Sequence, residues 1–241
     1  MSEATRTPLL DVPPEAAHRV ALLRDVPAGE LLIHEIYLSV QGESTFAGLP
    51  CVFVRTTVCD SRCKWCDTPH AFTRGQRMTR AEVLAKALSF DCPVVEITGG
   101  EPLLQADVLP LMTELCDAGK TVLLETSGAH AVNEVDRRVH IILDLKCPDS
   151  GESHRNRWAN LDVLKPTDEI KYVICDRPDF DWAVAHIRRH HLIGRVAILI
   201  SPAYGQVDPT ELAAWTLETR LPLRLQLQLH KQLWDPKARG V

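Results

Sequence analysis

The chain alternates between short apolar runs and longer segments in which apolar residues recur at helical spacing. Several runs are almost continuous in Val, Ile and Leu, which is typical of strands buried on both faces. We therefore predict a strand wherever such a run is bounded by turn or polar residues. The predicted strands cover residues 31–40, 52–56, 94–98, 121–125, 141–145, 169–174, 196–200 and 223–228.

Helix signals lie between these strands. Thr79 and Glu82 form a capping-box pattern, in which each side chain caps the other's backbone N–H. Gly119 is a favourable helix stop, and Asp208 before Pro209 is a favourable helix start. The predicted helices cover residues 83–88, 108–118 and 181–190, and a further one begins near residue 209.

Strands that alternate with helices imply a parallel sheet with right-handed crossovers. About six such units are too few for a closed eight-stranded barrel. The predicted fold is therefore α/β, either an incomplete TIM-type barrel of about six parallel strands or an open doubly wound sheet. We expect residues 30–241 to form one domain. Residues 1–29, which show little periodicity, are expected to be a partly ordered leader in which residues 16–23 could form a short helix.

The composition is that of an ordinary globular protein, with 45% hydrophobic and 24% charged residues and a formal net charge of −5. The chain has no block of Lys or Arg, which argues against a nucleic-acid groove. Its apolar runs are shorter than the ~20 residues that span a membrane, and its first residues lack the apolar core of a secretion signal. We therefore expect a cytoplasmic protein with neither a nucleic-acid nor a membrane partner.

Eight cysteines are present, and three of them are clustered on one short segment. In a long cytosolic chain, cysteines indicate metal binding or buried thiols rather than disulfides. Cys59, Cys63 and Cys66 supply three thiolates, whereas structural zinc sites and Fe–S clusters normally have four protein ligands. A centre with three protein ligands keeps one coordination position open, which is what chemistry at the metal requires. The spacing therefore favours a reactive [4Fe–4S] cluster.

Other interpretations of the cysteine cluster stay open. Zinc could be bound by the three cysteines together with His70 or Cys51, or three thiols could lie together by chance. Cys51 falls within a predicted strand, where a small core residue is more usual. The remaining cysteines are interpreted as core, spare or structural thiols: Cys92, Cys116, Cys147 and Cys175.

Polar or glycine-rich segments follow most of the predicted strands. The carboxyl ends of parallel strands meet at one edge of a sheet, where the active sites of α/β folds lie. We therefore expect segments that are far apart in the sequence to converge on one pocket. These segments are residues 59–68, 98–101, 126–128, 144–146 and 201–204.

The spacing of the three cysteines resembles that of the radical S-adenosylmethionine (SAM) superfamily, and Trp65 matches the aromatic residue usual before its last cysteine. Thr98-Gly99-Gly100-Glu101-Pro102 resembles the superfamily's Gly-Gly-Glu-Pro motif, which holds the amino group of SAM. Physically, glycines let backbone carbonyls approach a ligand closely. The resemblance implies a radical SAM core with a [4Fe–4S] cluster and SAM as cofactors.

The same resemblance implies a set of SAM contacts. Some members carry serine and proline at the positions of Asp144 and Leu145. At these two implied SAM contacts, this chain therefore departs from the sequence of those members. The implied SAM-binding residues are Trp65, Cys66, Asp67, Gly100, Glu101, Ser127, Asp144, Leu145 and Lys146.

Further motifs resemble one family within the superfamily, 7-carboxy-7-deazaguanine synthase. The similarity extends from about residue 30 to about residue 235. The motifs are Ser39-Val40-Gln41-Gly42-Glu43-Ser44, Arg55 at the end of its strand, Cys66-Asp67-Thr68, Leu124-Glu125-Thr126-Ser127-Gly128, Asp144-Leu145-Lys146-Cys147-Pro148, Glu169-Ile170-Lys171 and Gln226-Leu227-Gln228-Leu229-His230-Lys231.

This resemblance implies a carbon–nitrogen lyase of queuosine and 7-deazapurine biosynthesis. Such enzymes convert 6-carboxy-5,6,7,8-tetrahydropterin to 7-carboxy-7-deazaguanine and release ammonia. A 5′-deoxyadenosyl radical takes a hydrogen from C6 and later receives it back, so SAM is not consumed. Mg²⁺ holds the substrate carboxylate, and Thr68 matches its protein ligand. The resemblance further implies a homodimer and a reducing partner such as flavodoxin or ferredoxin.

The residues that could bind such a substrate also have ordinary roles. Arg55 can bind a carboxylate through two parallel hydrogen bonds, or it can form a structural ion pair. Thr68 could belong to a turn, and His230 could be a histidine without a ligand. Lys171 is expected to point into the barrel mouth or to pair with a carboxylate. The predicted substrate contacts are Val40, Gln41, Gly42, Glu43, Arg55, Thr98 and His230.

Two competing functions are considered. A radical SAM activase, which generates a glycyl radical on a partner protein, shares the cysteine and Gly-Gly-Glu motifs. The Gln-Gly-Glu segment, Arg55 and the Gln-Leu-His-Lys segment argue against it. A non-catalytic zinc module would explain neither the missing fourth ligand nor the polar segments at successive strand ends.

Overall fold

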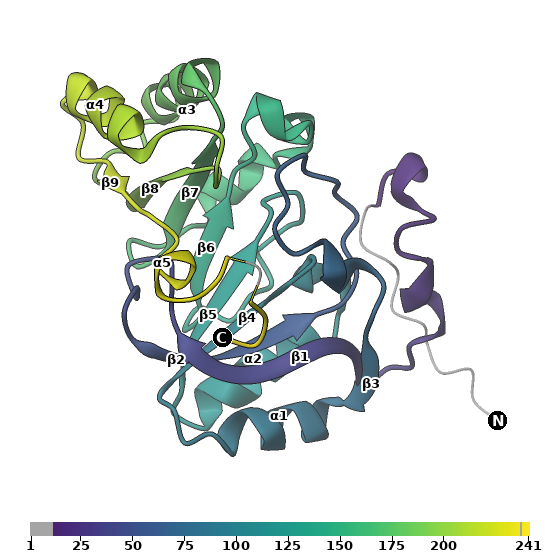
Figure 1. Cartoon of the computed structure of the whole chain (residues 1–241). Helices are drawn as coiled ribbons and strands as arrows, with labels where there is room; N and C mark the ends of the chain where they lie inside the picture. Colours follow the sequence, from purple (N-terminus) through teal and green to yellow (C-terminus); the bar gives the residue numbers. More distant parts are fainter. Residues whose placement is uncertain (1–11, 237) are drawn as a thin grey trace.

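The computed structural model describes residues 12–236 and 238–241 and contains one sheet of nine strands in the order β3-β1-β2-β4-β5-β6-β7-β8-β9. The run from β2 to β9 is parallel, whereas β1 pairs antiparallel with β2 and with β3. Because β3 and β9 end the sheet on opposite sides, the barrel is not closed (Figure 1). The strands are β1 Glu30–Val40, β2 Pro50–Thr56, β3 Gln76–Thr79, β4 Val94–Gly99, β5 Thr121–Thr126, β6 His140–Asp144, β7 Glu169–Ile174, β8 Ala197–Pro202 and β9 Arg224–Leu225.

The α-helices follow the predicted signals closely. Thr79 and Glu82 form the capping box at the start of α1, and Asp208 caps α4 through the N–H groups of Thr210 and Glu211. The start of α3 was predicted too late, because Asp176 caps this helix and α3 begins at Arg177, four residues before the predicted start at residue 181. The helices are α1 Arg80–Leu88, α2 Val108–Asp117, α3 Arg177–Arg189, α4 Pro209–Thr219 and α5 His230–Leu233. No helix in the described residues is long and apolar enough to cross a bilayer.

Alternation along the parallel strands separates the core from the site. On β4, Val95 and Ile97 face the core shared with the helices, while Glu96 and Thr98 face the other way. On β7, Ile170 and Tyr172 are in that core, and Lys171 between them lines the opposite, concave side. Since successive side chains of a strand point to opposite faces, the sheet buries one face in the core and presents charged groups on the other.

The two ends of the sheet differ from the prediction. The short strand β3 was not predicted, because its mostly exposed residues Gln76–Thr79 show no apolar alternation. The predicted strand 223–228 is reduced to Arg224–Leu225. Beyond β9, the Gln226 backbone N–H still bonds to Ile200, but its side chain reaches the carbonyl of Ser44, and the chain then leaves the sheet.

Part of the predicted leader packs onto the domain. Residues 14–16 and 21–25 form short 3₁₀ helices instead of the single helix suggested for residues 16–23. Val20 and Leu23 lie in a small apolar cluster with Leu32, Val58 and Leu104. This cluster holds the leader against the loop that follows β2, while the leader's residues 1–11 lie outside the described part of the chain.

Candidate active site

A cavity of about 240 Å³ opens on the concave side of the sheet, at the carboxyl ends of the parallel strands. Its wall is built from β1, β2, β4, β5, β6, β7 and β8, from the cysteine loop and from the C-terminal segment. All of the predicted site residues line it except Glu101 and Leu145. The convergence that was expected from the strand-end pattern is therefore present.

The two superfamily motifs lie against each other. The cysteine loop follows β2, the Gly-Gly-Glu segment follows β4, and these two strands are parallel neighbours. The N–H of Glu101 donates to the carbonyl of Val58 at 2.9 Å. A Cβ at Gly100 would lie 2.1 Å from the same carbonyl oxygen, so only glycine allows this approach. The contact fixes Cys59, the residue after Val58, relative to the floor of the cavity.

The three cysteines are more widely spaced than ligands of one ion. Cys59 is buried, Cys63 and Cys66 are half-buried, and all three line the cavity. In the part of the chain that the structure describes, they do not form a group whose ligand atoms all lie within 4.8 Å of one another. Four ligands around zinc at ~2.3 Å would place sulfurs about 3.8 Å apart. The loop therefore fits a larger cluster better than a single zinc ion.

Glu101 is held in place by the neighbouring strand end. Its carboxylate accepts hydrogen bonds from the Ser127 N–H and hydroxyl at 2.8 and 2.6 Å, from the Thr126 hydroxyl at 2.8 Å and from the Leu103 N–H at 3.0 Å. It is completely buried. These bonds tie the ends of β4 and β5 together. A contact between Glu101 and SAM stays a prediction.

Leu145 was predicted to contact SAM, but unlike Asp144 and Lys146 it does not line the cavity. Its side chain is fully buried in the core beneath the sheet, and its N–H donates to the carbonyl of Lys171. Asp144 and Lys146, on either side, line the cavity and pair with each other at 2.9 Å. The alternation thus turns the two charged residues toward the site and the leucine away from it.

Three buried polar atoms of the cavity wall have no hydrogen-bond partner among the described residues. They are the Trp65 Nε1, one Asp144 carboxylate oxygen (Oδ1) and the Ser201 hydroxyl. The Lys146 ammonium lies 4.7 Å from the centre of the Trp65 ring. Because buried polar groups are nearly always satisfied, this side of the cavity fits a polar ligand. The Asp144 carboxylate oxygen and the Trp65 N–H donor are therefore available to the two opposite charges of a zwitterionic molecule such as SAM.

Lys171 is the centre of a buried charge network. Its ammonium contacts Glu43 at 2.8 Å, Asp144 at 3.4 Å and also Glu125. Although burial opposes ionisation, Lys171 lowers the pKa of Glu43. Burial likewise opposes the charge on Lys171, but Glu125 and Glu43 raise the pKa of its ammonium well above the usual value. The lysine is therefore charged at neutral pH and offsets part of the surrounding negative charge.

Glu96 is the least ionisable carboxyl group of the site. It lies on β4 beside Gln41, whose amide donates to its Oε2 oxygen. Burial and, to a smaller extent, the nearby Glu125 carboxylate together raise the pKa of Glu96 to about 8. At neutral pH the floor of the cavity thus holds a proton that a solvent-exposed carboxyl would have lost.

We expect Glu96→Gln to change how stability depends on pH. Between pH 4.5 and about 8, folded Glu96 keeps a proton that the unfolded chain releases. The wild type must therefore lose stability as pH rises through this range, whereas the amide variant does not titrate. Urea unfolding at a series of pH values should show the difference, with exposed Glu134→Gln as the control that keeps the wild-type profile. A constant difference between wild type and Glu96→Gln would contradict the raised pKa.

Arg55 projects into the cavity from the end of β2. Its Nε donates to Glu35 at 2.8 Å, and its Nη2 donates to the Tyr37 hydroxyl at 3.0 Å. Both partners lie on the neighbouring strand β1 and also line the cavity. The structural ion pair considered from the sequence is therefore present, and it orients a guanidinium toward a space in which a carboxylate could be bound.

The C-terminal segment, which contains α5 and is drawn in yellow in Figure 1, contributes residues to the cavity wall. Lys231 pairs with Asp67 at 2.9 Å, and Gln228 donates to Glu43 and Asp67 at 2.8 and 3.1 Å. A Cβ at Gly42 would lie 2.3 Å from the His230 Nδ1, so this approach requires glycine. Contacts between the start of the domain and its last residues therefore complete the cavity.

Several residues of the wall were not predicted. The sequence did contain a signal for Glu96 and Glu125 as site residues. Each is a charged residue within an otherwise largely apolar strand, at a position that alternation turns away from the core. Glu35 and Tyr37 lie in the long first strand, in which only Val40 was predicted as a site residue. No sequence signal indicated residues 238–241, which also line the cavity.

Comparison with known proteins agrees with this geometry. The pattern of the radical SAM superfamily matches residues 53–201, from β2 to β8. The 7-carboxy-7-deazaguanine synthase of Chlorobaculum tepidum is 48% identical over 214 residues, which cover 88% of this chain and 97% of the relative. The chain belongs to the 7-carboxy-7-deazaguanine synthase family of the radical SAM superfamily.

Other relatives extend the same result. The 7-carboxy-7-deazaguanine synthase of Koribacter versatilis is 45% identical over 225 residues, covering 87% of this chain and 99% of the relative. The crystal structure of QueE from Escherichia coli superposes with a TM-score of 0.69 at 24% identity, over 83% of this chain and 95% of that one. This structural similarity concerns the fold, and it confirms the predicted incomplete barrel.

Proposed function

We propose that this protein converts 6-carboxy-5,6,7,8-tetrahydropterin to 7-carboxy-7-deazaguanine with release of ammonia. The observation that carries the proposal is that 97% of a 7-carboxy-7-deazaguanine synthase aligns with 88% of this chain, whose Gln41, Arg55 and cysteine loop line one cavity. A glycyl-radical activase would share the superfamily motifs alone. It would not account for the Gln41–Glu43 segment and Arg55, which line the same cavity as the cysteines.

The cysteine side of the cavity is suited to the cofactors. Cys59, Cys63 and Cys66 would hold the [4Fe–4S] cluster, and the unpartnered groups of Trp65 and Asp144 lie nearby to hold SAM. When bound, the cluster and SAM supply the radical that removes a hydrogen from the substrate. The glycines after β4 leave room for a ligand against backbone carbonyls.

Other residues of the cavity wall are suited to the substrate. Arg55 would bind the substrate carboxylate through its guanidinium, as a charge-assisted pair. Gln41, Thr98 and the protonated Glu96 present both donors and acceptors to the polar edge of a pterin. The charged Lys171 would orient Glu43 and Glu125, which could accept hydrogen bonds from ring N–H groups. These residues would bind and orient the ring.

Thr68 would be the protein ligand of Mg²⁺. Its hydroxyl lies on the cavity wall, 3.8 Å from the Cys66 sulfur. Mg²⁺ prefers oxygen ligands and commonly keeps few of them from the protein, the rest coming from water and substrate. The adjacent Asp67 is held by Lys231 and Gln228, so one hydroxyl and a substrate carboxylate are the natural oxygen donors here. We further propose a small reducing protein such as flavodoxin or ferredoxin as electron donor, and a homodimer as the assembly.

The reaction itself tests the proposal. The anaerobic protein, with its cluster reconstituted, is given reductant, SAM, Mg²⁺ and the carboxy-tetrahydropterin, and ammonia and deazaguanine are measured by mass spectrometry and enzymatic assay. We expect both products in equal amounts. Cleavage of SAM without either product would reject this substrate, and cleavage that depends on an added partner polypeptide would favour the activase.

Arg55→Ala is expected to weaken substrate binding and to leave the cluster intact. Loss of hydrogen bonds to a charged group costs about 1.5–3 kcal/mol, which corresponds to a KM about 10- to 100-fold higher. Arg55→Lys keeps the charge but not the two-pronged geometry and should fall in between. Steady-state kinetics with iron analysis measures both effects, and exposed Arg138→Ala is the control. Unchanged KM, or loss of iron, would contradict the proposed role of Arg55.

A further inference from the structure

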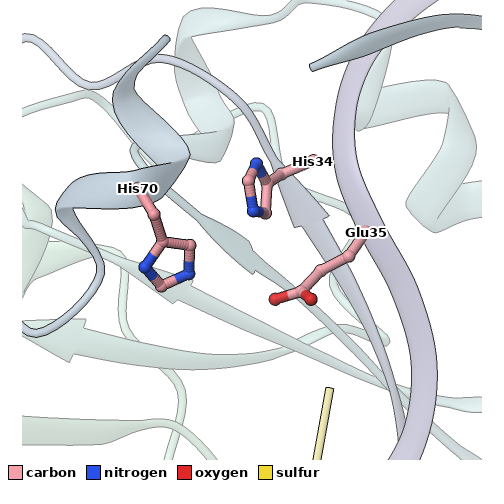
Figure 2. A group of neighbouring side chains, drawn as sticks. All are labelled: His34, Glu35 and His70. Carbon is pink, nitrogen blue, oxygen red and sulfur yellow. The ribbon is translucent and has the colours of Figure 1, made fainter. Parts of the chain in front are cut away.

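A second group of ligand-type side chains lies at the edge of the cavity and includes none of the cysteines. His34 and Glu35 come from β1, and His70 comes from a short 3₁₀ helix, Pro69–Phe72 (Figure 2). One nitrogen or oxygen atom of each lies within 4.8 Å of the others. Among the described residues, no other three His, Cys, Asp or Glu side chains meet this condition.

A β-bulge brings His34 and Glu35 together. On β1, the pairing with β2 passes from Ile33 opposite Thr56 directly to Glu35 opposite Arg55. His34 is therefore an extra residue without a partner in this ladder. Adjacent side chains of a regular strand point to opposite faces, but a bulge redirects a side chain, and bulges are common next to functional sites. Figure 2 shows both side chains directed into the space in front of His70.

The hydrogen bonding of His34 leaves its other ring nitrogen available. Nδ1 of His34 contacts the backbone carbonyl of Arg74. A carbonyl oxygen can only accept, so Nδ1 carries the hydrogen and the lone pair lies on Nε2. Histidines that bind metals typically donate their second ring N–H in this way, which fixes the tautomer and the orientation of the ring.

Glu35 and His70 also have free ligand atoms. Arg55 occupies the Oε1 oxygen of Glu35, and in the described part of the chain no hydrogen bond reaches Oε2 or either ring nitrogen of His70. The His34 and His70 rings are 5.0 Å apart at their centres and tilted by 52°. All three residues are half-buried, and Glu35 and His70 line the cavity.

We propose that His34, Glu35 and His70 bind one divalent transition-metal ion through two imidazole nitrogens and one carboxylate oxygen. This donor set suits Zn²⁺ or Fe²⁺, which accept imidazole ligands and keep further positions open. It does not suit Mg²⁺, which prefers oxygen, so the site differs in kind from the one expected at Thr68. The open positions would face the cavity. Because the ion and Arg55 would share the Glu35 carboxylate, metal binding would also influence the guanidinium.

The test uses Zn²⁺ as the probe on the cluster-containing protein under anaerobic conditions. After incubation and gel filtration, metal analysis gives zinc and iron per chain, and zinc K-edge X-ray absorption gives the ligand type. We expect one zinc per chain, nitrogen and oxygen neighbours with imidazole outer-shell scattering, and an iron content that does not change. No retained zinc, or sulfur neighbours that reveal zinc in the cysteine loop, would overturn the proposal.

Paired histidine variants locate the ion. His34→Asn with His70→Asn should abolish zinc retention, while the exposed histidines His18 and His154, changed to asparagine together, should leave it unchanged. Iron content and a thermal melt report whether each variant is folded. If the double variant does not fold, His70→Asn alone should weaken zinc binding at least about tenfold by titration. Equal zinc retention in wild type and in the folded histidine variant would overturn the proposal.

Discussion

Cys63→Ala is expected to remove both the iron–sulfur cluster and all turnover. Cys63 is the middle of three cysteines that line the cavity, and no other cysteine in the described residues does so. Two thiolates cannot hold the cluster while leaving only one iron open, so the variant should bind little iron. Iron and sulfide analysis, the brown colour and the electron paramagnetic resonance signal after reduction measure the loss.

The control for this change is Cys116→Ala. Cys116 is half-buried on α2 and packs against the core beneath the sheet, away from the cavity. It should keep about four irons per chain and its activity, with at most a small loss of stability. Full iron content in Cys63→Ala, or loss of iron in Cys116→Ala, would show that the cluster is not bound where the geometry indicates.

Lys171→Met is expected to have the largest effect on stability. The Lys171 side chain is 5% exposed, and its ammonium lies among the carboxylates of Glu43, Glu125 and Asp144. Removing one partner of a buried ion pair typically costs about 3–5 kcal/mol, because the remaining charge is left uncompensated. Urea unfolding measures the loss.

The loss should also depend on pH. Glu43 is held ionised by Lys171, and its pKa is lowered despite its burial; without the lysine, the carboxyl groups can relieve repulsion by taking up protons. The destabilisation should therefore be smaller in acid than at neutral pH. Exposed Lys86→Met is the control and should leave stability unchanged. A Lys171→Met protein as stable as the control would show that the network does not contribute to folding.

The sequence predicts most of the parallel sheet because the relevant signals are local. Strands such as Val94–Gly99 are apolar runs with clear ends, and the capping box at Thr79 needs only four consecutive residues. The meeting of the cysteine loop with the Gly-Gly-Glu segment also follows from local signals. Each comes after one of two strands that are parallel neighbours, so both must reach the same edge.

The features that escaped prediction depend on contacts between distant residues. The bond from Gln226 to Ser44 spans 182 positions and draws the chain away from the sheet where a longer strand was expected. The hydrogen bonds that Thr126 and Ser127 donate to the Glu101 carboxylate join two strand ends, and no local pattern indicates them. The bulge at His34 is a property of two paired strands, and neither strand shows it alone. Pairing register and side-chain partners are set by tertiary packing rather than by local pattern.

The most direct test of the proposed function is to count product molecules against SAM when SAM is limiting. The reconstituted protein is given excess carboxy-tetrahydropterin, reductant and Mg²⁺, with less SAM than substrate, and deazaguanine, ammonia and 5′-deoxyadenosine are quantified together. The account predicts more 7-carboxy-7-deazaguanine than SAM supplied, with one ammonia per product and little 5′-deoxyadenosine. Conversion of all SAM to 5′-deoxyadenosine with no deazaguanine would contradict it.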